Sequence, residues 1–341
     1  MLTLVIVTVF VALLFDFLNG MNDAANSIAT IVSTRVLSPR LAVLWAAFFN
    51  FFAVGIGLVF GFKVAGMIGK GIVDPDTVNA VFILSALLGA VFWTWICTRL
   101  GLPISVSHAL VGGLIGTAIA QASGFSTLMP RGILLIGLFI VVAPVMGGIL
   151  GYIFMIAVMW MFRKARPRKV NDWFRKLQLL SAAFYSLGHG LNDAQKTMGI
   201  ITVLLFSTGY LEKWFGFAEF QVTWQVAVAS SLAISLGTMA GGWRVIKTLG
   251  MRMTKLRPVH GFCAETAAAT SILISTLGGI PVSTTHVITG SIIGVGSVTS
   301  FSAVRWGVAL RIVGAWILTI PGTALVSMGM WYVLKLLPIQ G

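Results

Sequence analysis

Apolar runs of about 20 residues alternate with short polar connections along the whole chain. A helical run of this length crosses the hydrocarbon core of a bilayer, which is about 30 Å thick, because a helix rises about 1.5 Å per residue. The pattern predicts ten such segments: 3–33, 41–60, 78–98, 103–121, 131–162, 177–206, 220–241, 259–278, 281–298 and 304–337. The alternation that marks barrel strands is absent. The sequence therefore predicts an all-α integral membrane protein of about ten transmembrane or re-entrant helices.

Prolines mark the segments that depart from a straight span. Pro144 and Pro321 occupy matching places in the fifth and tenth segments, where we expect a break because proline removes a helical hydrogen bond. The fourth and ninth segments begin at Pro103 and Pro281 and are rich in Gly and Ser, so we expect re-entrant or broken helices there. Residues 1–15 lack the basic start and cleavage site of a signal peptide, and we assign them to the first mature helix.

Composition agrees with a membrane protein and excludes a soluble one. The chain is 58% apolar and 9% charged, with a mean hydropathy of +0.99, whereas a soluble domain is about 25% charged. The net charge of +14 invites a nucleic-acid partner, but the basic residues are placed for membrane topology instead, so we expect none. Cys97 and Cys263 both fall in apolar segments and indicate no disulfide or metal framework.

The basic residues divide unequally between the two sides of the membrane. With the N-terminus outside and ten crossings, sixteen of the 23 lie inside: Arg35, Arg40, Arg99, Arg163, Lys164, Arg166, Arg168, Lys169, Arg175, Lys176, Arg244, Lys247, Arg252, Lys255, Arg257 and Arg305. Five lie outside: Lys63, Lys70, Arg131, Lys213 and Lys335. This satisfies the positive-inside rule. We predict a multi-pass protein of the cell membrane with both termini external.

Two motifs occur twice, once in each half. Residues 20–27 (GMNDAANS) resemble residues 190–197 (GLNDAQKT) at an offset of 170, and residues 102–108 (LPISVSH) resemble residues 280–286 (IPVSTTH) at an offset of 178. Each half holds five segments, an odd number, so the second copy must be inverted relative to the first. We predict a first membrane repeat over 1–162, a basic cytoplasmic linker over 163–176 that forms a solvated loop, and a second, inverted repeat over 177–341.

Polar residues within the first motif pair form a stripe on one helix face. The positions i, i+3, i+4 and i+7 are Asn19, Asn22, Asp23 and Asn26 in the first half, with Asp16 one turn earlier, and His189, Asn192, Asp193 and Lys196 in the second. A charge at the middle of a membrane helix costs roughly 2.5–3.5 kcal/mol on insertion scales, so such residues indicate function. A single Asn could instead serve only to hydrogen-bond one helix to another. Two matching stripes that include carboxylates favour a functional role over this structural one.

The second motif pair predicts an anion site. Pro at the start of a helix, followed by Ser or Thr, brings together free N–H groups, hydroxyls and the positive end of the helix dipole. Ser105 and Ser107 in one half, and Ser283, Thr284 and Thr285 in the other, could thus surround a tetrahedral oxyanion. Carboxylates beside such an anion require a cation, either Na⁺ or a proton. His108 and His286 orient these turns or carry protons.

At these residues the chain resembles the PiT inorganic phosphate transporter family. The resemblance rests on the paired Asn-Asp motifs, the Ser/Thr tracts and residues 264–267 (AETA), and it covers essentially the whole chain. It implies a secondary transporter, not an enzyme, that takes up inorganic phosphate with Na⁺ or H⁺ at one central site shared by both repeats. Such a transporter is expected to need no cofactor and to have membrane lipid as its other partner. A homodimer is also possible.

The residue types and the resemblance together nominate the site residues. Those expected to bind substrate are Asn22, Asp23, Asn192, Asp193, Gln195, Lys196, Ser105, Ser107, Ser283, Thr284 and Thr285. Those expected to bind the cation are Asp23, Asn26, Asp193 and Glu265, with Na⁺ also possible at Asn22 and Asn192. Those expected to support the site are Asp16, His108, His189 and His286. Val106 stands opposite Thr284, so the two tracts donate unequally.

Three other functions stay open at this point. A transporter of sulfate or another tetrahedral oxyanion would have the same anion-binding turns, although sulfate can only accept hydrogen bonds, whereas phosphate can donate to carboxylates. A membrane enzyme acting on phosphorylated lipids would suit buried Asp and His, but no nucleophile or metal-ligand spacing is present. A channel would need rings of charge rather than one compact cluster.

We expect residues near Arg166 and Lys255 to face the cytoplasm. Single cysteines placed there should be labelled by a membrane-impermeant maleimide only after the cell membrane is opened. Labelling of intact cells at Arg166 would contradict both the orientation and the inverted second repeat.

Overall fold

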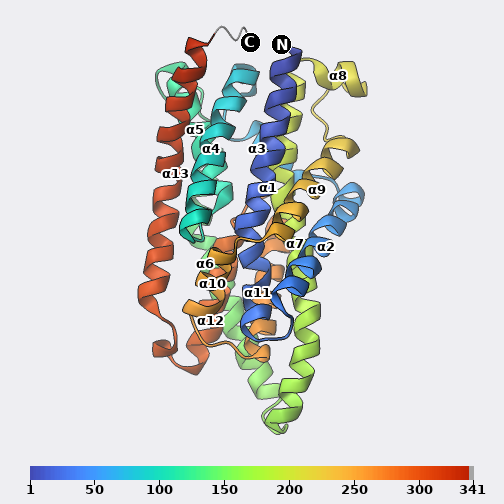
Figure 1. The fold of residues 1–341 in the computed structure, drawn as a ribbon, viewed down its shortest axis with the longest axis vertical. Coiled ribbons are helices and arrows are strands. Elements are labelled where there is room, and N and C mark those ends of the chain that lie inside the picture. Colours follow the sequence, from blue (N-terminus) through green and yellow to red (C-terminus); the bar gives the residue numbers. More distant parts are fainter. Residues whose placement is uncertain (338–341) are drawn as a thin grey trace.

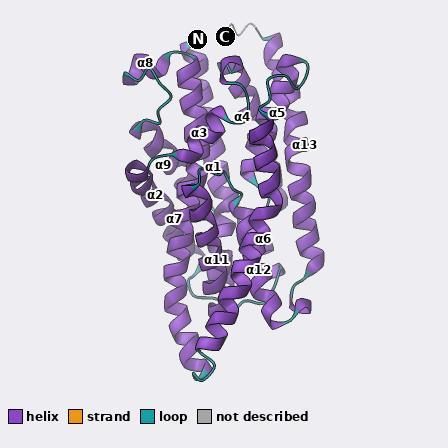
Figure 2. Cartoon of the chain, turned by 180° about the vertical axis from the view of Figure 1, so that it is seen from behind, coloured by secondary structure: helices purple, strands orange, loops and turns teal. Residues whose placement is uncertain are grey.

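The computed structural model describes residues 1–337, and they form a bundle of helices elongated along one axis (Figure 1). Its α-helices are α1 (Leu2–Ser33), α2 (Pro39–Phe60), α3 (Lys63–Lys70), α4 (Ala80–Leu100), α5 (Val106–Ala122), α6 (Pro130–Met161), α7 (Pro167–Ser207), α8 (Tyr210–Phe215), α9 (Trp224–Ala240), α10 (Trp243–Arg252), α11 (Pro258–Leu277), α12 (Thr284–Thr299) and α13 (Trp306–Leu336). Short 3₁₀ turns, Pro75–Thr77 and Phe301–Ala303, precede α4 and α13. Helices dominate the view from behind as well (Figure 2).

The all-helical fold class is confirmed, and each of the ten predicted segments corresponds to one helix of at least 16 residues. Five helices, α1, α2, α4, α6 and α13, are long and apolar enough to cross a membrane, and α9 with α10 forms a sixth candidate that bends by 73°. The short helices α3, α8 and α10 were not predicted. Because α5 and α12 have 17 and 16 residues, each is only about 25 Å long and falls short of a full hydrocarbon core.

Two predictions, of helix breaks at proline and of a loop between the halves, were wrong. Pro144 lies inside the continuous α6 and Pro321 inside the continuous α13, since a membrane helix tolerates one missing hydrogen bond when neighbouring helices pack around it. The stretch 163–176 is not a loop throughout, because α7 begins at Pro167, whose fixed φ suits the first helical position. At 41 residues, α7 is about twice as long as a span requires, so its basic start extends beyond the membrane.

The two ends of the bundle differ in what they carry. The start of α1 and the end of α13 lie at one end, whereas the turn between α6 and α7 lies at the opposite end (Figure 1). The basic segment and the start of α1 and end of α13 therefore lie at opposite ends of the bundle, as the topology prediction requires, and the side that faces the cytoplasm stays a prediction. The last four residues of the predicted second repeat, 338–341, lie outside the described residues.

The helix contacts of the two halves pair off. α1 packs on α9 as α7 packs on α2, and α1 packs on α10 as α7 packs on α3. In the same way α4 packs on α5 and α13, whereas α11 packs on α12 and α6. Each of these contacts is reproduced when the helices α1 to α6 are exchanged, in order, for α7 and α9 to α13. The short α8 has no counterpart in this exchange.

The apolar core is divided by a polar layer. In α1, the buried apolar residues Leu4 to Phe15 belong to one cluster with α4 and α5, and Ala24 to Ile31 belong to a second cluster with α10, α11 and α12. In α7, Ala182 and Tyr185 belong to the second cluster, and residues from Ala194 onward to the first. The polar stripes of both helices thus lie between two apolar clusters, in the middle of the bundle.

Glycines bring α5 against α13 and α12 against α6. A Cβ at Gly112 or Gly116 would lie 2.5 or 2.2 Å from a carbonyl oxygen of α13, and one at Gly290 or Gly294 would lie 2.0 Å from a carbonyl oxygen of α6. The pairs are again 178 residues apart. Such close backbone approach is typical of membrane helix packing.

Replacing Gly294 with Ala should therefore destabilise the protein by about 1–3 kcal/mol, because the backbone of α6 cannot yield as a side chain would. Gly314→Ala in α13 is the matched control, since nothing lies within 4 Å of a Cβ there and helix propensity alone favours Ala. Thermal unfolding in detergent measures both. Equal unfolding temperatures for the two variants would contradict the tight packing.

Candidate functional site

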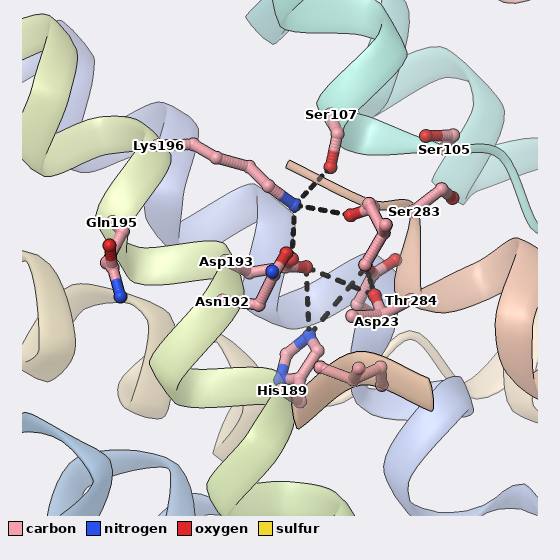
Figure 3. Close-up of polar contacts among 12 residues, drawn as sticks. Asp23, Ser105, Ser107, His189, Asn192, Asp193, Gln195, Lys196, Ser283 and Thr284 are labelled. Carbon is pink, nitrogen blue, oxygen red and sulfur yellow. Dashed lines mark hydrogen bonds and ion pairs between the residues drawn. The ribbon is translucent and has the colours of Figure 1, made fainter. Parts of the chain in front are cut away.

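The middle of the bundle holds a compact cluster of charged side chains. Asp23 of α1 and His189 and Asp193 of α7 have ligand atoms that all lie within 4.8 Å of one another. His189 Nε2 is 3.3 Å from Asp193 Oδ2 and 3.7 Å from Asp23 Oδ2. The hydroxyl of Thr284, in the first turn of α12, contacts Asp23 Oδ2 at 3.1 Å and Asp193 Oδ2 at 3.2 Å. Figure 3 shows these side chains turned toward one another.

Lys196 places a cation beside this cluster. It is 1% exposed, and its ammonium group donates to Asp193 Oδ1, to Ser107 Oγ at 2.5 Å and to the Val282 carbonyl at 2.9 Å. The ammonium therefore joins α7 to the start of α5 and to the segment before α12 (Figure 3). Pairing with a carboxylate offsets part of the cost of burying both charges.

Thr285 connects the second tract to the first half. Its hydroxyl lies 3.3 Å from Asp23 Oδ1 and 2.9 Å from the Ile104 carbonyl, and Asn26 Nδ2 donates to it at 2.9 Å. Asn26 thus contacts the site through Thr285.

Two helices begin at the cluster. Ser105 and Ser283 are the N-caps of α5 and α12, and their hydroxyls accept from the amides of His108 at 3.2 Å and His286 at 3.3 Å. The remaining first-turn amides have no partner within their own helix, so both N-termini present N–H groups and a partial positive charge to the centre. Gly101 and Gly279, at φ +73° and +72°, make the sharp turns that lead into both tracts.

A chain of three residues fixes the ring of His189. Asn50 of α2 donates from Nδ2 to Thr238 Oγ1 at 2.9 Å, and Thr238 donates to the Ile234 carbonyl at 2.9 Å. This network assigns Asn50 Oδ1 as the acceptor that faces His189 Nδ1 at 3.1 Å. With Nδ1–H directed to Asn50, Nε2 is left facing the two carboxylates. Neither Asn50 nor Thr238 belongs to a repeated motif, so the sequence carried no signal for their role.

The two predicted Asn residues make matching contacts. Asn22 Nδ2 donates to Thr98 Oγ1 at 2.8 Å, and Asn192 Nδ2 donates to Thr276 Oγ1 at 2.8 Å. Thr98 and Thr276 are 178 residues apart, each five residues before the proline of its tract. The offset of the repeat could therefore have identified them. The amide oxygens of both Asn side chains are buried and accept no hydrogen bond.

Gln195 lies elsewhere. Its Oε1 accepts from the first amides of α3, those of Val64 at 2.9 Å and Ala65 at 3.3 Å, and its Nε2 donates to the Leu191 carbonyl at 2.8 Å. The side chain points away from the charged cluster (Figure 3). In the structure it satisfies the N-terminus of α3 and is not next to the groups predicted to bind substrate with it.

Glu265 lies in a second polar cluster between α1, α7 and α11. Its Oε1 accepts from Thr30 at 2.6 Å and from Gln178 at 3.0 Å, and its Oε2 accepts from Ser181 at 2.5 Å. No basic side chain in the described part of the chain pairs with it. The repeat offset places Leu87 at the corresponding position, so this cluster exists in one half alone.

The remaining predicted residues surround the centre. Asp16 is fully buried beside the side chains of Asn19 and Thr197. His108 and His286 contact each other edge to face with ring centroids 4.8 Å apart, and His286 stacks on Trp316 at 3.7 Å. These two rings brace the first turns of α5 and α12.

Apolar helices around a buried, charge-paired centre define a polytopic membrane protein of the transporter class, and comparison with known proteins gives the family. The sequence profile of the phosphate transporter family matches residues 19–327, and the chain belongs to this family. The resemblance seen in the motifs is thereby confirmed, and the chain is a phosphate transporter rather than an enzyme.

Individual relatives agree with this assignment. A probable low-affinity inorganic phosphate transporter of Rhizobium meliloti (strain 1021) is 53% identical over 93% of this chain and 92% of its own length. One of Bacillus subtilis (strain 168) is 41% identical over 99% of both chains. Among solved structures, the sodium-dependent phosphate transporter superposes with a TM-score of 0.86 at 28% identity, over 98% of this chain and 100% of that one.

The position of Gln195 predicts a structural phenotype. Gln195→Ala should lower stability by about 1–3 kcal/mol, because two buried amides of α3 lose their acceptor. The KM for phosphate in reconstituted vesicles should stay unchanged. Gln121→Ala is the control, because it removes another glutamine side chain, one that is half-buried and donates to the Thr77 carbonyl. An unaltered unfolding temperature with a raised KM would instead place Gln195 at the substrate.

Proposed function

We propose that this protein takes up inorganic phosphate together with Na⁺ or H⁺ at one central site built by two inverted repeats. The observation that carries the proposal is the meeting of two carboxylates, an imidazole, an ammonium group and two helix N-termini in one buried cluster. Asp23 and the start of α5 come from the first half, whereas His189, Asp193, Lys196 and the start of α12 come from the second.

The donors of the cluster suit a tetrahedral oxyanion. Lys196, the hydroxyls of Ser107, Thr284 and Thr285, and the first amides of α5 and α12 all lie at the centre. Together they provide hydrogen bonds from several directions and positive charge from one ammonium group and two helix dipoles. Ser105 and Ser283 hold these helix starts in place as N-caps.

The acceptors of the cluster favour phosphate over sulfate. Asp23 and Asp193 lie beside the donors, and a carboxylate next to a fully ionised sulfate would be repelled without any compensating hydrogen bond. Phosphate carries at least one proton at neutral pH and can donate it to such an oxygen. The names of the relatives from Rhizobium meliloti and Bacillus subtilis point to the same substrate.

The coupling cation has oxygen ligands available. The amide nitrogens of Asn22 and Asn192 donate to Thr98 and Thr276, their amide oxygens accept no hydrogen bond, and the carboxylates of Asp23 and Asp193 follow them on the same helices. Hard cations prefer such oxygens. The solved relative is named the sodium-dependent phosphate transporter, which supports Na⁺ in this role. His189 Nε2, directed at both carboxylates, provides the corresponding place for a proton.

The inverted repeat is supported by the paired helix contacts and by the two sequence offsets. With this arrangement, the two halves present equivalent surfaces to the central site from opposite sides of the membrane. Alternate opening of those surfaces is the usual way in which inverted repeats move a substrate across a bilayer.

Uptake of radiolabelled phosphate into proteoliposomes tests the proposal. Asp23→Asn and Asp193→Asn each preserve side-chain volume while removing one charge-assisted interaction, worth roughly 1.5–3 kcal/mol or about 10- to 150-fold in an equilibrium constant. Each should nearly abolish uptake at limiting phosphate. Asp172→Asn, at an exposed position near the start of α7, should leave uptake intact. About half of the activity remaining after either change would indicate two independent sites and contradict the shared one.

We also propose that Glu265 contributes to cation binding. The hydroxyls of Thr30 and Ser181 contact its carboxylate, so a small cation there would find oxygen ligands on three side chains, whereas Gln178 presents its amide nitrogen. Glu265→Gln should weaken the dependence of uptake on an imposed Na⁺ gradient, or on an imposed pH gradient if the proton is coupled. Glu212→Gln in α8 is the control. The same dependence on both gradients as in the unaltered protein would remove Glu265 from the cation pathway.

A further inference from the structure

A cavity of about 1020 Å³ lies at the end of the bundle that carries the α6–α7 turn. It is formed by the end of α6, the beginning of α7, the segment between α10 and α11, and the end of α12 with the turn that follows it. None of the residues of the central charged cluster lines it. It is therefore a second site, separate from the one proposed to bind phosphate.

One wall of this cavity is basic. Lys255 and Arg257 line it from the segment between α10 and α11, Arg305 lines it from the segment before α13, and no acidic residue is among its lining residues. In the described part of the chain, these three side chains form no ion pair with a carboxylate. The polar groups of Asn171 and Thr299 add hydrogen-bonding capacity. Three cationic side chains that line one cavity and pair with no carboxylate favour an anion there.

Another part of the lining is apolar and is continuous with an exposed apolar helix face. Met155, Val158, Met159 and Phe162 of α6 line the cavity. Met159 is 52% exposed, and Ile149, Ile153 and Ile156 on the preceding turns of α6 are also exposed. An exposed apolar helix face of this kind is covered by acyl chains in a bilayer. The cavity thus has one side suited to a charged headgroup and another side continuous with the lipid-facing surface.

We propose that this cavity binds an anionic phospholipid, with its phosphodiester headgroup held by Lys255, Arg257 and Arg305 and an acyl chain lying along α6. Basic pockets between helices on the cytoplasmic side are known to suit anionic lipid headgroups. Free phosphate would use the basic wall alone and would leave the apolar wall unexplained. The lipid joins α6, α7, α11 and α12, which belong to both halves, at the end predicted to be cytoplasmic. The proposal does not depend on which substrate the central site carries.

Binding of phosphatidylglycerol to the delipidated full-length protein in an uncharged detergent tests this proposal. Native mass spectrometry counts the lipid retained, and thermal unfolding reports its effect. The triple variant Lys255→Gln, Arg257→Gln, Arg305→Gln should bind this lipid on the order of 100-fold more weakly, from about fivefold per basic residue. The control is Lys164→Gln, Arg168→Gln, Lys169→Gln, which removes the same charge from exposed positions at the same end and outside the cavity. This control should bind as the unaltered protein does.

Further arms separate the alternatives and guard against misfolding. The double variant Arg257→Lys, Arg305→Lys keeps the charge and should retain most binding, whereas Val158→Glu on the apolar wall should lose it. Three other compounds serve as comparisons: phosphatidylcholine, glycerophosphoglycerol without acyl chains, and inorganic phosphate. With each of them, any shift in unfolding temperature should be the same in the unaltered protein and in the triple variant. Equal loss of lipid from both triple variants would overturn the proposal, as would a cavity-dependent shift with inorganic phosphate or with the free headgroup.

Discussion

The need to neutralise charge within an apolar bundle governs this structure. Asp23, His189, Asp193 and Lys196 are at most 2% exposed, and each buried ion would cost several kcal/mol without a partner. The partners lie on different helices: Asp23 belongs to α1, the ammonium group to α7, and the shared hydroxyl of Thr284 to α12. Asp23, the carboxylate of the first half, finds its partners His189, Thr284 and Thr285 in the second half, and Lys196 of the second half donates to Ser107 of the first. The charged centre therefore requires both halves to pack together.

The rest of the fold makes that meeting possible. Glycine rows let α12 lie directly on α6 and α5 on α13, which fixes where the two helix N-termini point. Apolar clusters above and below hold α1 and α7 so that only their middle turns are polar. Contacts of Asn50, Thr98 and Thr276 then orient the groups at the centre. Because these supporting residues are themselves buried, a displaced helix would leave several polar groups without partners at once.

Much of this arrangement was predictable, for a physical reason. Carboxylates are so costly in membrane helices that Asp23 and Asp193, found twice at one offset, had to meet some common partner. What the sequence did not reveal were contacts formed by ordinary residues. Gln195 has the same position in its motif as a substrate ligand would, yet it accepts the amides of α3, a short helix that hydropathy does not detect. Pro144 and Pro321 carry a local signal for a break, which packing against α12 and α5 overrides. Asn50 lies outside every repeated motif, and only the structure connects it with His189.

The central claim is that both halves build a single substrate site, and the number of phosphate ions bound per chain tests it most directly. Equilibrium binding of radiolabelled phosphate to the purified protein, measured at saturating phosphate and in the presence of Na⁺, gives this number without any assumption about transport. The account predicts one phosphate per chain. Two phosphates of similar affinity per chain would mean that each half binds its own, and would contradict the shared charged centre.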